Sequence, residues 1–227
     1  MGILLYERRS IGGGKMNVRV PVRQSEHERE RIAAKNMRSN DRFLNYAHRS
    51  IILSVRESAG FGAERMARLV DGSYWIGRGY IDKYSPMAKT DDEYAIDSYY
   101  AMRVELGYIG YDPSVELWPD VPFTIADMGL RGKQSASIRM ENAFYLEFAN
   151  KMSFYVREMA AMVALHLHQE DGFGATRIRR SMGQFRDEWM ELMRIYLRKD
   201  KAGVLQEMRR MLDRYNACPI FKDEYTL

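Results

Sequence analysis

The sequence predicts an all-α protein made of two similar helical units. Two observations carry this prediction. Apolar residues recur at mixed three- and four-residue spacings among many strong helix formers, which is the periodicity of amphipathic helices. A Gly-Phe-Gly-Ala sequence also occurs twice, at 60–63 and 172–175, each time between two helical stretches. Neither unit could bury its apolar face alone, so we expect the two units to pack against each other.

The first 24 residues are predicted to form an N-terminal arm. The run Gly-Gly-Gly-Lys at 12–15 directly precedes Met16, and its codons can spell a purine-rich stretch like a ribosome-binding site. Two interpretations remain open. Either Met16 is the natural start and residues 1–15 are a translated leader, or the glycines form a flexible hinge behind a short arm.

Residues 25–106 are predicted to form the first helical unit. Ser25 and Glu28 form a capping box at the start of its first helix. The second helix follows the first Gly-Phe-Gly corner, and the glycines of "DGSYWIGRGY" (71–80) are expected to interrupt or bend it. The third helix is expected over 90–106, because its acidic start suits the positive end of the helix dipole.

Residues 107–136 are predicted to connect the two units. Their first part, 107–123, holds three of the six prolines and two glycines. Aromatic residues there indicate that the connector packs against the helices rather than moving freely. These aromatic residues are Tyr108, Tyr111, Trp118 and Phe123.

Residues 137–227 are predicted to form the second helical unit and a tail. Ser135 or Ser137 is expected to cap its first helix. Its three helices are expected, in order, at 138–168, 175–198 and 201–215. Residues of the two units also agree at an offset of 112 positions beyond the corners, which we interpret as an internal duplication. The matched pairs are Ile51 and Val163, Leu53 and Leu165, Arg65 and Arg177, Arg68 and Arg180, and Tyr84 and Tyr196.

The two corners allow a structural and a functional interpretation. In the structural one, Gly60 and Gly172 are left-handed residues that end helices, and Phe61 and Phe173 return to the core. In the functional one, each corner is the turn of a helix-turn-helix whose second helix enters a DNA major groove. The apolar spacing of the first copy fits this motif. Arg56 does not, because it lies where the two helices cross closely and a small residue is expected.

Arginines near the starts of the helices after the corners are the candidate binding residues. They are Arg65, Arg68, Arg177, Arg179, Arg180 and Arg186. Arginine binds phosphate or a guanine edge in bidentate fashion, but it also forms ion pairs with nearby acidic residues on mixed-charge helices. At the second corner three of these arginines stand beside the free amides of a helix N-terminus. We therefore expect a surface for nucleic acid or an acidic protein partner there.

No residue pattern in the chain indicates catalysis. Cys218 is the sole cysteine, which excludes an internal disulfide and a cysteine-rich zinc site. His166 and His168 are two residues apart, so a helix points them in nearly opposite directions and they cannot share a metal ion. The chain contains no P-loop, GxGxxG or GxSxG motif. We expect a non-enzymatic protein with no cofactor and no metal.

Charge and hydropathy restrict the location and the partners. The net charge of +4 is compatible with a polyanionic partner but does not require one. No apolar run approaches the ~18 residues of a membrane span. The cysteine content fits a reducing compartment. We expect a cytoplasmic protein of the host bacterial cell that makes no membrane contact, and a homodimer is compatible with the sequence.

The stretch "LHLHQEDGFGATRIRR" (165–180) resembles a family of uncharacterised proteins carried by phages and integrated mobile elements of Gram-positive bacteria. In that family a helix ending in a leucine-histidine-glutamate-like turn leads into Gly-Phe-Gly and a basic pair. The resemblance covers about thirty residues around each corner. The first copy departs from it, with Glu64 where a basic residue is common. No catalytic residue carries over from the family.

The resemblance implies a genetic context, and two function classes follow from it. Accessory phage genes of this size commonly encode inhibitors of host defence, such as anti-CRISPR proteins, or regulators of the element's own genes. The expected function is binding and inhibition of a host defence protein or nucleoprotein complex. The alternative is a helix-turn-helix-like DNA-binding regulator that uses the basic helices after the corners.

Overall fold

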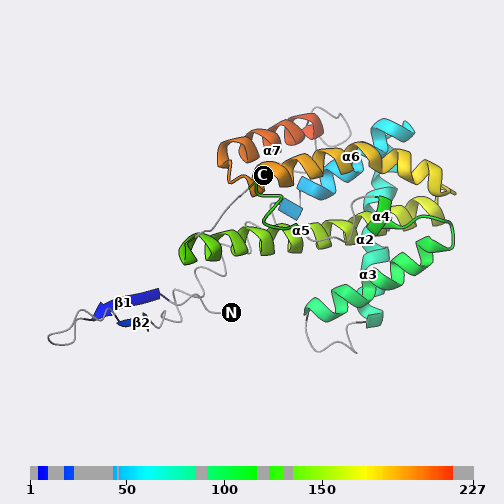
Figure 1. The fold of residues 1–227 in the computed structure, drawn as a ribbon. Coiled ribbons are helices and arrows are strands. Elements are labelled where there is room, and N and C mark those ends of the chain that lie inside the picture. The colour runs from blue at the N-terminus through cyan, green and yellow to red at the C-terminus, as the bar shows by residue number, and fades with distance from the viewer. Residues whose placement is uncertain are drawn as a thin grey trace. The chain divides into compact units, whose positions relative to one another are not determined.

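The structure is a computed structural model that describes residues 5–9, 18–22, 43–44, 46–84, 91–116, 123–129 and 135–216. The chain divides into two compact units, 1–42 and 43–227. In the first unit, strands β1 (Leu5–Arg9) and β2 (Val18–Val22) pair antiparallel, with Leu5 opposite Val22 and Arg9 opposite Val18 (Figure 1). Met16 and the capping box at 25–28 lie outside the described residues.

The β-hairpin was not expected from the sequence, which was interpreted as an arm at this end. Its signal is present in β2, where valines alternate with other residues in the two-residue period of a strand. Pro21 lies within this strand. A two-stranded sheet tolerates it, because both strands are edges and one side of each needs no ladder hydrogen bond.

The second unit is helical, which confirms the all-α prediction for this part of the chain. Helical residues 46–59, called helix 46–59 below, precede the first corner. The later helices are α2 (Ala63–Tyr84), α3 (Asp91–Gly107), α4 (Pro113–Glu116), α5 (Ala136–Gln169), α6 (Ala175–Leu197) and α7 (Lys201–Asn216). Ser135 is the N-cap of α5, and its side chain accepts a hydrogen bond from the Ile138 amide.

Helix α2 is continuous, so the expected interruption at residues 71–80 is wrong. Gly72 and Gly77 lie inside the helix because α5 crosses it closely at both places. A Cβ atom at Gly72 would lie 2.1 Å from Nδ1 of His166, and one at Gly77 would lie 2.5 Å from Sδ of Met162. These glycines therefore allow two helices to approach each other and do not mark a turn.

Helix α5 is the centre of the unit. It packs against α2, α3 and α6, while α7 packs against α6. Figure 1 shows α6 running alongside α5, with α7 along the far side of α6. Trp189 is the largest fully buried side chain, and its indole nitrogen donates a 3.4 Å hydrogen bond to Ser153 on α5. The apolar spacing of these helices thus forms one core shared by the whole unit.

The connector packs only in part. Tyr111 is fully buried, as expected from its apolar ring, whereas Tyr108 is 86% exposed. Asp112 holds the turn before α4, because its carboxylate accepts hydrogen bonds from Ser114 and Arg103. Burial opposes the charged form of this carboxyl, but these hydrogen bonds lower the pKa of Asp112. Trp118 lies outside the described residues.

Candidate functional site

The glycines that begin the two corners adopt the same backbone conformation. Gly60 has φ +68° and Gly172 has φ +66°, a left-handed region that side-chain-bearing residues rarely adopt. At the second corner the amide of Phe173 donates to the carbonyl of Leu167, which satisfies an orphan carbonyl at the end of α5. The glycines therefore end helices, as the structural interpretation requires.

The two corners contact each other through their phenylalanines. The ring centroids of Phe61 and Phe173 are 5.8 Å apart with an interplanar angle of 74°, the edge-to-face geometry that aromatic pairs favour. Both rings are buried. One turn later Met66 and Ile178 are also buried, and each amide donates to the last glycine of its corner. The contact therefore places the first turns of α2 and α6 beside each other.

Two exposed arginines cover these rings. The guanidinium carbon of Arg65 lies 4.6 Å from the centroid of Phe61, and that of Arg177 lies 3.8 Å from the centroid of Phe173. Such stacking is favourable, because the negative face of the ring attracts the cation. Arg65 also forms an ion pair with Asp171 of the second corner at 3.0 Å. This acidic residue therefore compensates an arginine of α2 rather than those of its own neighbouring helix.

Two other candidate arginines contact residues away from the two rings. Arg179 donates to the carboxylate of Glu116 at 2.6 Å and to the carbonyl of Gly110 at 2.8 Å, so it fastens α6 to the connector. Arg186 forms an ion pair with its neighbour Asp187. The sequence could not indicate the Glu116 contact, because its two partners are 63 positions apart.

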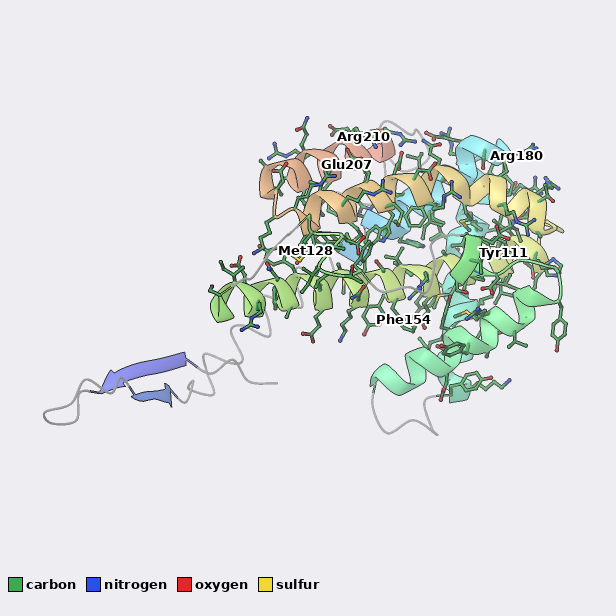
Figure 2. The ribbon with its side chains drawn as sticks, viewed as in Figure 1. Tyr111, Met128, Phe154, Arg180, Glu207 and Arg210 are labelled. Atoms are coloured by element: carbon green, nitrogen blue, oxygen red, sulfur yellow. The ribbon has the colours of Figure 1, made fainter. Side chains whose placement is uncertain are left out.

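Arg68 and Arg180 remain near the corners. Arg68 makes a long 3.4 Å contact with Glu64, and its side chain is 63% exposed. Arg180 makes no hydrogen bond or ion pair within the described part of the chain, and Figure 2 shows it near the start of α6. We call Arg65, Arg68, Arg177 and Arg180, with the two rings beneath them, the paired-corner surface.

A groove lies beside this surface, between α2 and the end of α5. Its volume is about 660 Å³. The α2 wall carries Arg68, Asp71 and Trp75, and the α5 wall carries His166 and Glu170. Trp75 is 67% exposed although it is a large aromatic residue. The groove therefore combines charged groups of both signs with an accessible indole ring.

His166 is buried in the α5 wall, and its Nδ1 atom has no hydrogen-bond partner in the structure. Burial lowers the pKa of His166, against the opposite effect of the Asp171 and Glu170 carboxylates. In His168, by contrast, Nδ1 lies 3.1 Å from the carbonyl oxygen of Phe173. The two histidines thus lie in different surroundings, and the described residues contain no group of three or more metal-ligating side chains.

Helix α3 carries a second unusual feature. Tyr100 and Val104 are 52% and 60% exposed, and their four-residue spacing places them on one face of the helix. Tyr108, in the turn directly after the helix, is 86% exposed. We call these three residues the α3 stripe. The opposite face of α3 is buried through Tyr99, Met102 and Leu106. Sequence reasoning missed the stripe. Its signal is the presence of large apolar or aromatic residues on two opposite faces in the second half of the helix, where an amphipathic helix has them on one.

Glu158 is a buried carboxyl between α3 and α5. The hydroxyl of Ser98 on α3 donates to its carboxylate at 2.9 Å. Burial raises the pKa of Glu158 to about 7, because a charged carboxylate loses hydration in this position. The packing of α3 on α5 therefore includes a group that titrates near neutral pH.

Comparison with known proteins adds no family. No protein-family model, no curated protein and no solved structure matches this chain. None of the helices that the structure describes has both the length and the apolar character needed to cross a membrane.

Proposed function

We propose that this chain is a non-enzymatic binding protein that inhibits a host defence protein or nucleoprotein complex, in the manner of anti-CRISPR proteins. The phage-like sequence around the second corner supplies the biological context of this proposal. The α3 stripe is the observation that carries it. Exposed aromatic residues close together, here on a helix and in the turn after it, are typical of protein interfaces, where a tyrosine buries a large area at low entropic cost.

The docking face is tested by altering the α3 stripe. Tyr100→Ser with Tyr108→Ser should abolish protection of a phage from a CRISPR-bearing host, measured as the loss of plaques. The melting temperature should change little, because both side chains are exposed. Leu205→Ser on α7 is the matched control, since Leu205 is also exposed but lies on another helix.

Two outcomes would contradict this proposal. If the unmodified protein gives no protection against any defence system tested, inhibition of host defence is wrong. If protection persists in the double variant, the α3 stripe is not the docking face. A photoreactive residue at Val104, compared with one at Leu205, then identifies the partner directly by the mass of the crosslinked product.

A DNA-binding regulator is the second candidate, and the paired-corner surface favours it. Two helix N-termini lie beside each other there, and each carries free backbone amides and a partial positive charge. Four exposed arginines surround them, and arginine recognises phosphate through its planar fork. An operator in the DNA of the mobile element would then be contacted by the first turns of α2 and α6.

Salt dependence separates this candidate from the first. Duplex DNA binding should weaken steeply with salt, and Arg68→Ala with Arg180→Ala should lower the slope of log affinity against log salt by roughly two. Arg194→Ala is the control, because Arg194 is exposed on α6 but pairs with Glu191 away from the corners. Binding that is weak and unchanged by the double variant would contradict a regulator. Arg177 and Arg179 are left intact, because they contact Phe173 and Glu116.

We also propose that the two halves of the helical unit descend from one duplicated helical unit. Two contacts support this. Ser54 of helix 46–59 donates to the Ser181 carbonyl of α6, and its counterpart at an offset of 112, His166 of α5, packs on Gly72 of α2. Each first helix thus crosses the second helix of the other half. A crystal structure in which residues 25–106 and 137–217 do not superpose as helical units would contradict the duplication.

A further inference from the structure

We propose that the groove between α2 and the end of α5 binds an arginine side chain presented by a protein partner. This inference concerns the chemistry of the ligand. It does not rest on whether that partner is a defence protein, so the two proposals can fail separately. Three observations carry it: a filled counterpart of the groove, the balance of charge and the exposed indole.

The molecule contains a counterpart of this groove that an arginine already fills. Where the end of helix 46–59 crosses α6, Arg214 of α7 lies between two carboxylates. Its guanidinium donates to Glu57 of helix 46–59 at 2.6 Å and also to Glu188 of α6. One planar guanidinium thus bridges acidic groups from two crossing helices, which a compact ammonium does less well.

The groove occupies the corresponding crossing in the other half. Gln169 and Gly72 correspond, at the offset of 112, to Glu57 and Gln184 of the filled crossing. Helix α3 follows α2 as α7 follows α6, but no described residue of α3 lines the groove. Instead, Glu105 of α3 accepts a hydrogen bond from Gln169 at 2.6 Å. The crossing that α7 fills on one side is therefore left open by α3 on the other.

The charges of the groove favour a cation. Three carboxylates and two arginines line it. Arg65 pairs with Asp171, and Arg68 makes a long 3.4 Å contact with Glu64. This leaves the carboxylates of Asp71 and Glu170, which face the groove from opposite walls and have no ion-pair partner among the described residues. A guanidinium between the two walls would bridge these carboxylates as Arg214 bridges its own pair.

One further group suits a guanidinium in particular. Trp75 presents an exposed indole face, and an indole is the ring on which a guanidinium stacks most favourably. The five N–H donors of a guanidinium could bind both carboxylates while its plane lies on this ring. His166 also lines the groove, but its buried Nδ1 lies against Gly72, so this atom takes no part in the proposed contact.

The full chain can be tested with small probes. We would titrate it with N-acetyl-arginine amide and follow the indole signal of Trp75 by NMR. N-acetyl-citrulline amide is the matched probe, because it has nearly the same shape but no charge. We expect a saturable shift with arginine, none with citrulline, and roughly tenfold weaker binding by Asp71→Asn with Glu170→Gln. Asp82→Asn is the control variant, since Asp82 pairs with Arg78 outside the groove.

Three results would overturn the inference. The first is a shift of Trp75 with citrulline amide that equals the shift with arginine amide, a comparison that needs no variant. The second is binding of arginine amide by the double variant that equals binding by the unmodified protein. The third is a shift of Trp75 with uridine monophosphate and none with arginine amide, which would make the groove a nucleotide site served by Arg65 and Arg68.

Discussion

Two helix crossings of this protein, that of helix 46–59 with α6 and that of α5 with α2, share a local sequence pattern, but one is filled and the other is open. In each, a helix ends at a left-handed glycine, a buried phenylalanine follows, and the next helix carries an arginine four residues after that phenylalanine. At one crossing Arg214 of α7 fills the space and joins two carboxylates. At the other an open groove remains over His166. The helix that follows each crossing, α7 on one side and α3 on the other, therefore determines which crossing is available for binding. The corner does not.

The largest expected effect comes from the contact shared by both crossings. Phe173→Ala should lower the free energy of unfolding by roughly 3 to 4 kcal/mol, because a fully buried ring is removed and a cavity is left. Phe61→Ala should have a similar effect, since the two rings pack on each other. Urea denaturation measures both. A change near zero in the free energy of unfolding would show that the corners do not stabilise the fold. It would favour a binding role for them.

Carboxyl groups in the two halves should also differ in their response to pH. Glu158 of α5 packs against α3 and has its pKa raised to about 7, whereas the carboxylates of the filled crossing are paired with Arg214. Folding therefore leads Glu158 to take up a proton between about pH 4.5 and 7, so its contribution to stability falls as the pH rises through this range. Glu158→Gln should remove this dependence and stabilise the protein above pH 7 by about 3 kcal/mol.

Denaturation of both proteins at pH 5 and pH 8 tests this. The unmodified protein should be the less stable of the two at the higher pH, and the proteins should differ little at the lower. Ser98 can still donate to the amide oxygen of the variant, so no hydrogen bond is lost. An equal pH dependence in both proteins would show that Glu158 is not the group that titrates.

The comparison also shows what the sequence could and could not reveal. Helix boundaries, the Ser135 cap and the acidic start of α3 depend on neighbouring residues, and periodicity and capping rules predict them. The fates of the arginines depend on residues far away in the chain, as the pairs of Arg65 with Asp171 and Arg179 with Glu116 show. No local pattern contains that information.

The glycines of α2 illustrate the same limit. A glycine inside a helical pattern weakens the prediction of a helix, because it costs about 1 kcal/mol relative to alanine. Gly72 and Gly77 are nonetheless helical, since α5 presses against them. The groove could not be predicted either, because it exists only where α2 and α5 cross and no third helix covers the crossing. Each residue of the α2 wall is at least 90 sequence positions away from every residue of the α5 wall.

Substitution of glycines in α2 tests how closely α2 and α5 cross beside the groove. Gly72→Ala should destabilise the protein by about 2 kcal/mol, because the new methyl group would lie against the His166 ring and displace it. Gly79→Ala in the same helix is the matched control, since a Cβ atom there meets nothing within 4 Å. That variant should be stabilised by up to about 1 kcal/mol. If both variants respond alike in thermal denaturation, α2 and α5 do not cross closely at Gly72.

The smallest effect tests the filled crossing itself. Arg214→Met keeps much of the length of the side chain but leaves Glu57 and Glu188 without their shared cation. We expect a loss of about 1 kcal/mol, because the pair is only partly buried and Arg210 still reaches Glu188. Arg194→Met should change stability by less than about 0.5 kcal/mol, since its pair with Glu191 is exposed.

The NMR titration of the Arg214→Met variant then tests whether the two crossings bind the same kind of ligand. Arg214→Met empties a second acidic site, so N-acetyl-arginine amide should now also perturb α6 signals near Glu188. If only Trp75 responds in this variant, the two crossings do not share a ligand chemistry.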